Sequence, residues 1–276
     1  MFHKSFATVR GKEWLPPMPI GVVEKVWRHG KWMFFAVRTS KRLEVVRANM
    51  GMSGRFASVS LGRLPPHTKA RHVRWTIRYS YGVETRRLLY LDPRCMGRLK
   101  RLDDEQRLEA TNTMFGSRGA PSMKLGPDAL GLVFTNAPKW RALQVIRERL
   151  NKQRGTKRLL MEQSRVAGLG NIYAAEACWY MRVHPDYPGC NLTNEHLSRY
   201  LQHVPEMLRR SIRAGGTSFG DANSYRDSRG KEGNNSSNLH VYGRENQPCH
   251  RCSSMILKTK QGGRSTYHCP RCQRIT

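Results

Sequence analysis

The stretch PCHRCSSMILKTKQGGRSTYHCPRC at residues 248–272 carries two CxxC pairs, Cys249 with Cys252 and Cys269 with Cys272. Sixteen residues separate the pairs. Two such turns at this separation close a tetrahedral four-thiolate site on a β-hairpin, which is the geometry of structural zinc. Redox chemistry of a lone CxxC is the alternative, and the second pair argues against it. A closed thiolate site has no position for water, so we expect the Zn2+ to fold the ribbon and to do no chemistry.

The residues between the two pairs predict the shape of the ribbon. Gly262-Gly263 is a turn signal between two short strands. Arg264 follows the turn directly, so we expect its guanidinium near the tip of the hairpin, where it can grip a phosphate.

The charge of the whole chain points to a polyanionic partner. The 276 residues contain 49 Lys and Arg against 20 Asp and Glu, a formal net charge of +29. Lys and Arg bind a phosphate backbone by releasing its condensed counterions, so nucleic acid, RNA or DNA, is the expected partner. A membrane is not expected, because no apolar stretch approaches the ~18 residues of a span.

The hydrophobic pattern predicts an α+β fold in three parts. Residues 1–120 contain short strand-like runs and are expected to form a β-sandwich domain. Residues 121–236 are expected to be a helical domain and residues 237–276 the zinc ribbon. The predicted strands cover residues 32–37, 43–50, 72–79 and 86–91, and residues 111–122 are expected to be a linker.

Two apolar stripes at helical spacing predict core-facing helices. One comprises Trp140, Leu143, Ile146 and Leu150, and the other comprises Leu197, Leu201, Val204, Leu208 and Ile212. Thr193 is a plausible N-cap of the second helix, and Gly215-Gly216 is a stop signal. Residues 221–238 are rich in Asn, Ser and Gly, which predicts a long loop.

Residues 157–176, KRLLMEQSRVAGLGNIYAAE, separate the two stripes. A helix is expected to end near Gln163 and another to begin near Asn171, with Gly168 and Gly170 in the turn between them. Glycines allow close backbone approach, and the N–H groups at a helix start attract phosphate. A plain helix hairpin is the alternative, and the glycines alone do not exclude it.

Residues 157–185 resemble the helix–two-turn–helix of the Fpg/Nei (formamidopyrimidine-DNA glycosylase) family, and the tail from Val241 to Cys272 resembles its zinc ribbon. Further matches occur in family order, at Gly30-Lys31-Trp32, residues 51–54, Asp92-Pro93-Arg94, residues 125–127 and residues 215–217. The resemblance implies a β-sandwich, a helical domain and a ribbon, with DNA bound by both domains. It also implies removal of oxidised bases by nucleotide flipping, followed by strand cleavage.

The chain departs from the family at its start. The family's nucleophile is an N-terminal proline amine, and the adjacent glutamate is the general acid and base. This sequence begins Met1-Phe2-His3-Lys4, without either residue. We therefore expect that the catalytic pair is missing.

Other family positions carry over residue by residue, as what the resemblance implies. Lys31 matches a lysine that contacts phosphate and assists elimination, and Arg264 matches the ribbon arginine with a similar role. Met52, Arg94 and Met96 match the residues that fill the gap left by a flipped base. The remaining matches lie in the helical domain and are expected to serve DNA binding: Lys152, Lys157, Gly168, Gly170 and Asn171. The family's phosphate-binding histidine corresponds to His67 or His72.

Three functions remain open at this point. The leading hypothesis is a catalytically inactive, structural RNA or DNA binder, with a protein of an organellar (mitochondrial) ribosome or another ribonucleoprotein as its concrete form. The alternative is a working base-excision DNA glycosylase and abasic-site lyase that removes oxidised purines. An abasic-site binder that does not cut is the third.

The opening residues bear on location. The segment MFHKSFATVRGKEW is basic, carries hydroxyls and has no acid before Glu13, which is the composition of an organelle transit peptide. An ordinary basic arm is the alternative. An intracellular, organellar location is therefore expected.

Overall fold

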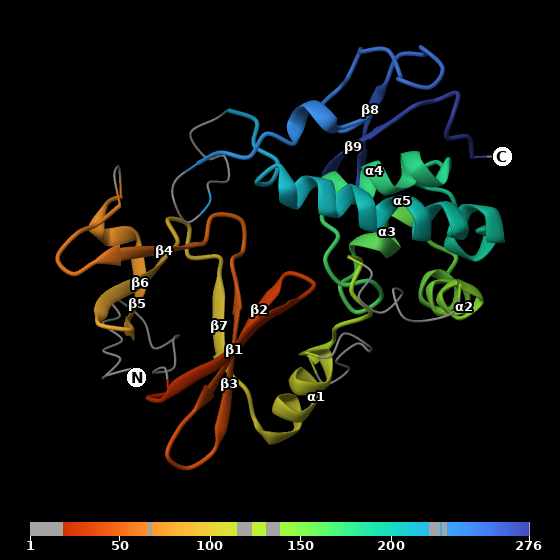
Figure 1. The fold of residues 1–276 in the computed structure, drawn as a ribbon. Helices are drawn as coiled ribbons and strands as arrows, with labels where there is room; N and C mark the ends of the chain where they lie inside the picture. The colour runs from red at the N-terminus through yellow and green to blue at the C-terminus, as the bar shows by residue number, and fades with distance from the viewer. Residues whose placement is uncertain are drawn as a thin grey trace. The chain divides into compact units, whose positions relative to one another are not determined.

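The computed structural model describes residues 19–65, 68–114, 123–130, 139–220, 227 and 231–275. The chain forms two compact units, Met1–Met114 with Ala214–Asn234 and Phe115–Arg213 with Asn235–Thr276 (Figure 1). Each unit has a hydrophobic core of its own, as described below.

The first unit contains two antiparallel sheets. Sheet A has the order β1-β2-β3-β7, with β1 at Val22–His29, β2 at Trp32–Arg38, β3 at Leu43–Asn49 and β7 at Arg98–Arg101. Sheet B has the order β4-β6-β5, with β4 at Arg55–Ser60, β6 at Glu84–Leu91 and β5 at Val73–Tyr81, preceded by a 3-10 turn at Ala70–His72. Helix α1 spans Asp104–Met114 and contacts β1 and β3.

The two sheets share one core, which confirms the predicted sandwich. Side chains alternate between the two faces of each strand. Phe35, Val37 and Ala48 of sheet A therefore meet Trp75 and Tyr90 of sheet B, all buried. The predicted strands correspond to β2, β3, β5 and β6, whereas β1, β4 and β7 are short or strongly charged and were not expected.

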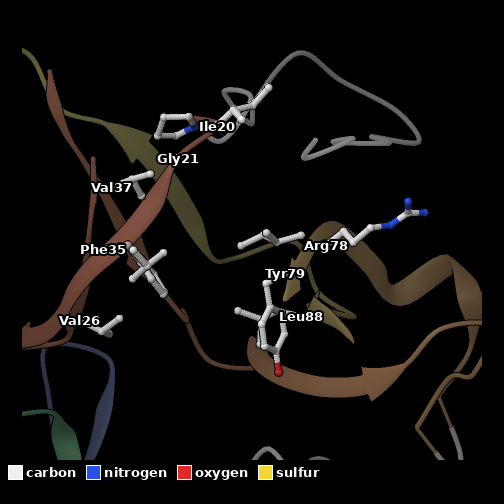
Figure 2. Close-up of a pocket in the computed structure, with 11 residues that line it drawn as sticks. Ile20, Gly21, Val26, Phe35, Val37, Arg78, Tyr79 and Leu88 are labelled. Atoms are coloured by element: carbon white, nitrogen blue, oxygen red, sulfur yellow. The ribbon is translucent and has the colours of Figure 1, made fainter. Parts of the chain in front are cut away.

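An apolar slot of about 270 Å³ opens between β1 and β5, the edge strands of the two sheets (Figure 2). Phe35 and Val37 line one wall, and Ile77 and Leu88 line the other. Arg78 lies at the rim, and its guanidinium extends away from the slot (Figure 2). The slot is thus an apolar gap between the inner faces of sheets A and B.

The second unit is helical and carries the ribbon. Its helices are α2 at Lys139–Leu150, α3 at Thr156–Met161, α4 at Asn171–Met181 and α5 at Asn194–Arg213, with 3-10 turns at Gly189–Asn191 and Ser236–Asn238. Its core includes Ile146, Leu159, Ala174, Leu197 and Val204, each with a solvent exposure of 0%. The hairpin strands are β8 at Leu257–Gln261 and β9 at Arg264–His268.

The ends of α5 follow the predicted signals. The Thr193 hydroxyl accepts a hydrogen bond from the His196 N–H at 3.3 Å, as an N-cap does. Gly215 and Gly216 follow the helix with φ angles of 75° and 97°, which are left-handed conformations that favour glycine.

Two residues of the predicted core stripes lie at the surface. Trp140 in the first turn of α2 is 65% exposed, and Ile212 in the last turn of α5 is 61% exposed. The other residues of both stripes are buried or partly buried, including Leu150 at the very end of α2 with 0% exposure, so only the first turn of α2 and the last turn of α5 leave the core.

The predicted loops differ in part from the structure. Thr111 to Met114 continue helix α1, while residues 115–122 lie outside the described residues. Of the predicted loop at 221–238, residue 227 and residues 231–238 are described and include the short turn at Ser236–Asn238. No helix in the described parts of the chain is long and apolar enough to cross a membrane.

Candidate metal centre and nucleic-acid interface

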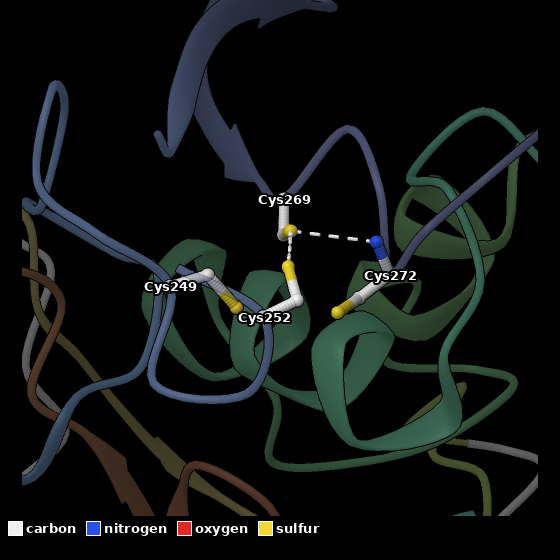
Figure 3. A group of neighbouring side chains, drawn as sticks. All are labelled: Cys249, Cys252, Cys269 and Cys272. Atoms are coloured by element: carbon white, nitrogen blue, oxygen red, sulfur yellow. Dashed lines mark hydrogen bonds between the residues drawn. The ribbon is translucent and has the colours of Figure 1, made fainter. Parts of the chain in front are cut away.

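The four cysteines of the two CxxC pairs converge on one point, as predicted. Their sulfur atoms all lie within 4.8 Å of one another, at the base of the hairpin (Figure 3). Four thiolates about 2.3 Å from a zinc ion would lie about 3.8 Å apart, so the donor set fits tetrahedral zinc. Backbone N–H groups of Arg251 and Cys272 point at the sulfurs of Cys249 and Cys269, at 3.5 and 3.4 Å. The chain therefore carries a structural zinc centre.

Helix α4 holds the ribbon in place through the buried Glu176. Its carboxylate accepts hydrogen bonds from the backbone N–H groups of His240, Val241 and Tyr242 at 2.8, 2.8 and 2.9 Å. The side chain is 1% exposed, so these three bonds replace its hydration. Glu176 was not among the residues predicted from the sequence, although an acid inside the apolar run Ala174–Trp179 indicates a buried role.

Aromatic packing also stabilises the contact between α4 and the ribbon. His240 stacks on Trp179 with ring centroids 4.0 Å apart, and the Arg251 guanidinium lies 3.9 Å above the Trp179 ring. Trp179 also packs with Cys249, Ile256 and Cys269 in one buried cluster. The ribbon is therefore packed onto α4 and does not project as a free hairpin.

The turn segment, residues 163–170, joins α3 to α4 in the predicted place. The Gln163 side chain organises it by donating to the carbonyl oxygens of Met161 and Leu169, each at 2.9 Å, and by accepting the Gly168 N–H at 2.9 Å. Gly168 has a φ of 115°, a conformation that residues with a Cβ rarely adopt. No side chain caps the start of α4 at Gly170. The helix start can therefore face an anion.

A buried lysine connects the start of α4 to the hairpin. The Lys157 side chain is 0% exposed, and its amine donates to Asn171 Oδ1 at 2.6 Å and to Thr266 Oγ1 at 2.7 Å. The Asn171 amide nitrogen in turn donates to the Ser265 carbonyl oxygen at 2.9 Å. Burial lowers the pKa of Lys157 to about 8, and the nearby Arg264 charge acts in the same direction.

This network sets the positions of the predicted binding residues in the second unit. Arg264 begins β9 beside the turn Gly262-Gly263 and is exposed, as is Lys152 just after α2. Lys157 and Asn171 instead point inward to each other. In this arrangement Lys157 has no surface with which to meet a phosphate.

In the first unit, two loops meet through Asp92. Its carboxylate accepts from the Ser53 hydroxyl at 2.5 Å and from the Gly97 N–H at 2.7 Å, and it is 1% exposed. A Cβ added to Gly51 would lie 2.7 Å from the Met96 carbonyl carbon, so the loops touch closely. The side chains on these loops stay exposed, with Met52 at 68% and Met96 at 47%.

Lys31 and Arg94 lie at the same end of this unit. The Lys31 carbonyl oxygen accepts from the Asn49 side chain at 3.0 Å, and the Gly51 N–H donates to Asn49 Oδ1 at 2.9 Å. Arg94 follows Asp92, and its N–H lies 3.4 Å from the Ser53 hydroxyl. The side chains of Lys31 and Arg94 are exposed. The structure thus brings together Lys31, Met52, Arg94 and Met96.

Of the two candidate histidines, His72 is described and His67 lies outside the described residues. Burial lowers the pKa of His72, and the charges of Arg71, Lys69 and Arg74 lower it further. Arg74, which the sequence reading missed, donates to the Asp92 carbonyl oxygen at 2.8 Å. His72 therefore lies among cations whose positive charge favours the binding of an anion.

Family models match three parts of the chain. Residues 18–99 match the formamidopyrimidine-DNA glycosylase N-terminal domain, and residues 125–223 match the H2TH domain of the same enzyme. Residues 246–275 match the zinc finger found in FPG and IleRS.

Curated relatives match most of the chain. Formamidopyrimidine-DNA glycosylase of Chloroflexus aurantiacus is 33% identical over 251 residues, covering 91% of this chain and 80% of the relative. The enzyme of the same name from a Synechococcus strain is 31% identical over 275 residues, covering 99% and 89%.

Solved structures share the fold. A Lactococcus lactis Fpg variant in complex with Fapy-dG-containing DNA matches with a TM-score of 0.72 and 26% identity, covering 92% of this chain and 83% of that one. MutM (Fpg) of Thermus thermophilus matches with a TM-score of 0.69 and 30% identity, covering 91% and 82%.

These similarities correct the leading functional hypothesis. The reading as a non-enzymatic structural binder of a ribonucleoprotein is wrong, because relatives up to 38% identical are named DNA glycosylases. The expectation that the chain is not an enzyme is wrong for the same reason. The net charge indicates affinity for phosphate groups, but it does not distinguish an enzyme from a non-catalytic binder. Residues 1–18, on which the expected loss of catalysis rested, lie outside the described residues.

Proposed function

The chain belongs to the formamidopyrimidine-DNA glycosylase family, and from this premise we propose that it is a base-excision DNA glycosylase and abasic-site lyase acting on oxidised purines in duplex DNA. The similarity to relatives named for this activity carries the proposal. This similarity extends over the β-sandwich, the turn segment and the ribbon, and the exposed cations lie in these parts of the chain.

We assign DNA contact to the exposed residues and positioning to the buried ones. Lys31, Lys152 and Arg264 are exposed cations suited to phosphate oxygens. The uncapped start of α4 at Gly170 offers backbone N–H groups and a positive dipole end. Lys157 and Asn171 hold this helix start against the hairpin, so that Arg264 and α4 can bind the same strand.

The loops joined by Asp92 are suited to the space that a flipped nucleotide leaves. Met52 and Met96 are exposed, flexible and apolar, so they can enter a base stack. Arg94 belongs to the same pair of loops and is exposed, so it can hydrogen-bond the base opposite the lesion. Extrusion costs a few kcal/mol of stacking, which these insertions partly offset.

The chemistry that the family resemblance implies begins with an amine of the chain attacking C1′ of the damaged nucleotide. The bond between C1′ and the base breaks, and the base leaves with a proton. The C1′–O4′ bond then breaks, O4′ takes a proton, and an iminium forms at C1′. The iminium loses its C2′ proton, and the C3′–O bond breaks with departure of the 3′ phosphate, which cuts the strand. In the family resemblance, Lys31 and Arg264 match cations that assist this elimination, and a cation stabilises the phosphate that leaves.

The direct test is base excision. The full chain, loaded with zinc, is incubated with a duplex that carries one 8-oxoguanine, and the released base and the cut strand are measured separately. We expect both products, and none from an undamaged duplex of the same sequence. Binding of the damaged duplex at protein excess with neither product would contradict the proposal.

The organellar location stays a prediction, since it rests on residues 1–14. Imaging the full chain with a C-terminal fluorescent tag tests it. Co-localisation with an organelle marker is expected, and a diffuse or nuclear signal would contradict it.

A further inference from the structure

The outer face of sheet B places two arginines side by side. Arg78 on β5 is the direct antiparallel partner of Arg87 on β6. Side chains of such partners lie on one face with Cβ atoms about 5 Å apart, and like charges there are destabilising. The pair therefore has an unfavourable interaction of its own, which a bound polyanion would relieve.

A third arginine joins this pair, and we call Arg63, Arg78 and Arg87 the arginine cluster. The Arg87 guanidinium donates to the Arg63 carbonyl oxygen at 2.8 Å, which holds the loop after β4 against this face. The side chains of Arg63 and Arg78 are exposed. Burial leaves the Arg87 Nε without a hydrogen-bond partner. The exposed guanidinium groups of Arg63 and Arg78 can therefore donate to a ligand, whereas the buried Arg87 Nε cannot reach one.

No acid neutralises the cluster in the part of the chain that the structure describes. Glu84, the acid of sheet B, lies 3.6 Å from Arg86 instead. Arg86 precedes Arg87 and pairs with Tyr79, so it projects from the opposite face of the sheet. The other arginines of this unit that pair with acids include Arg38 with Glu24, on sheet A.

We propose that the arginine cluster is a second DNA contact, which binds phosphodiester groups of duplex DNA away from the damaged nucleotide. Guanidinium groups bind phosphate oxygens with two parallel hydrogen bonds, and adjacent arginines suit consecutive phosphates. The choice of DNA as the polyanion rests on the proposed function.

The position of the cluster separates it from the lesion-binding loops. Arg87 precedes Asp92 by five positions along β6 and its exit, which is about 17 Å in a strand. That length corresponds to about five nucleotides at 3.4 Å each. The cluster should therefore bind damaged and undamaged duplexes alike.

The test is the salt dependence of binding for the full chain carrying Arg63→Gln and Arg78→Gln. Dissociation constants are measured between 50 and 300 mM salt, on an undamaged duplex and on one with an abasic-site analogue. We expect the slope of log K against log salt to become shallower by about 2, at roughly 0.9 per phosphate lost. The fold loss should be the same on both duplexes.

The matched control is Arg38→Gln with Lys41→Gln, which removes two positive charges from the end of β2 and the turn that follows it and should keep the original slope. Equal slopes for the two double variants would overturn the proposal, and so would a loss confined to the damaged duplex. A larger loss on an RNA hairpin or an acidic peptide than on DNA would also overturn it. Binding to undamaged duplex is measured without catalysis, so failed base excision would refute the proposed function and leave this inference standing.

Discussion

Lys157 has an unusual environment for a charged residue, because it is fully buried between a helix start and a hairpin. Its amine has two oxygen partners, on Asn171 and Thr266. Unpaired burial of an ammonium would be costly, and the two hydrogen bonds offset part of that cost. We infer that this residue positions Arg264 and α4 and does not itself meet DNA.

Lys157→Met keeps the length of the side chain and removes both hydrogen bonds. We expect DNA affinity to fall on the order of 30-fold, since a bond to a charged group contributes about 2 kcal/mol. Fluorescence anisotropy on an abasic-analogue duplex measures it. Arg141→Met, at an exposed position of α2, is the control for loss of one charge. An equal loss in both variants would refute the positioning role.

The lowered pKa of Lys157 predicts a pH effect on stability. The folded pKa is about 8 against 10.5 for the free side chain. Between these values the unfolded chain holds a proton that the folded chain has released, so the free energy of unfolding rises with pH. The rise is at most about 1.4 kcal/mol per pH unit. Urea unfolding at pH 7.5, 8.5 and 9.5 measures it, and Lys157→Met should lack it. Parallel pH profiles would contradict this account.

At the scale of elements, the contact of α4 with the ribbon depends on Glu176. Glu176→Gln turns one acceptor oxygen into an amide donor that faces backbone N–H groups. We expect a loss of about 2–3 kcal/mol in the free energy of unfolding, because buried donors lose their partner. Thermal unfolding measures it. Glu195→Gln, at an exposed position of α5, should change stability little, and a comparable effect of both variants would exclude the assigned role.

Removal of zinc should disrupt the contacts between the hairpin and the start of α4. Once a chelator strips the metal, the four thiolates repel and the ribbon loses its fold. Thr266 then no longer holds Lys157, and Arg264 loses its place. We expect one zinc per chain by colorimetric assay, and loss of DNA binding that returns when zinc is restored. Full affinity in the metal-free protein would show that the ribbon does not contribute.

The elements differ in how far they could be predicted. The hairpin, the turn segment and the ends of α5 were predictable, because cysteine spacing and glycines act locally. Strand β1 was not, since its sequence VVEKVWRH mixes charge with apolar residues at the edge of a sheet. The inward orientation of Lys157 was not predictable either. It depends on Thr266, more than a hundred positions away in the chain.

At the scale of the whole molecule, the charge, taken together with the absence of the family's N-terminal proline and glutamate, led to the wrong functional class. A value of +29 is compatible with an enzyme or a structural protein, because both bind phosphates. The sequence alone was enough to name candidate site residues, which stay predictions, whereas the contacts of Glu176, Asp92 and Arg74 emerged only from the fold. Each of these forms its contacts with segments distant in sequence.

The central claim is that an amine of this chain attacks the sugar at a damaged position. The most direct measurement is borohydride trapping of the full, zinc-loaded chain on a duplex with one abasic site, followed by mass spectrometry of the adduct. We predict a covalent complex at one modified amine, and none on an intact duplex. Saturating binding of the abasic duplex without an adduct would contradict the claim.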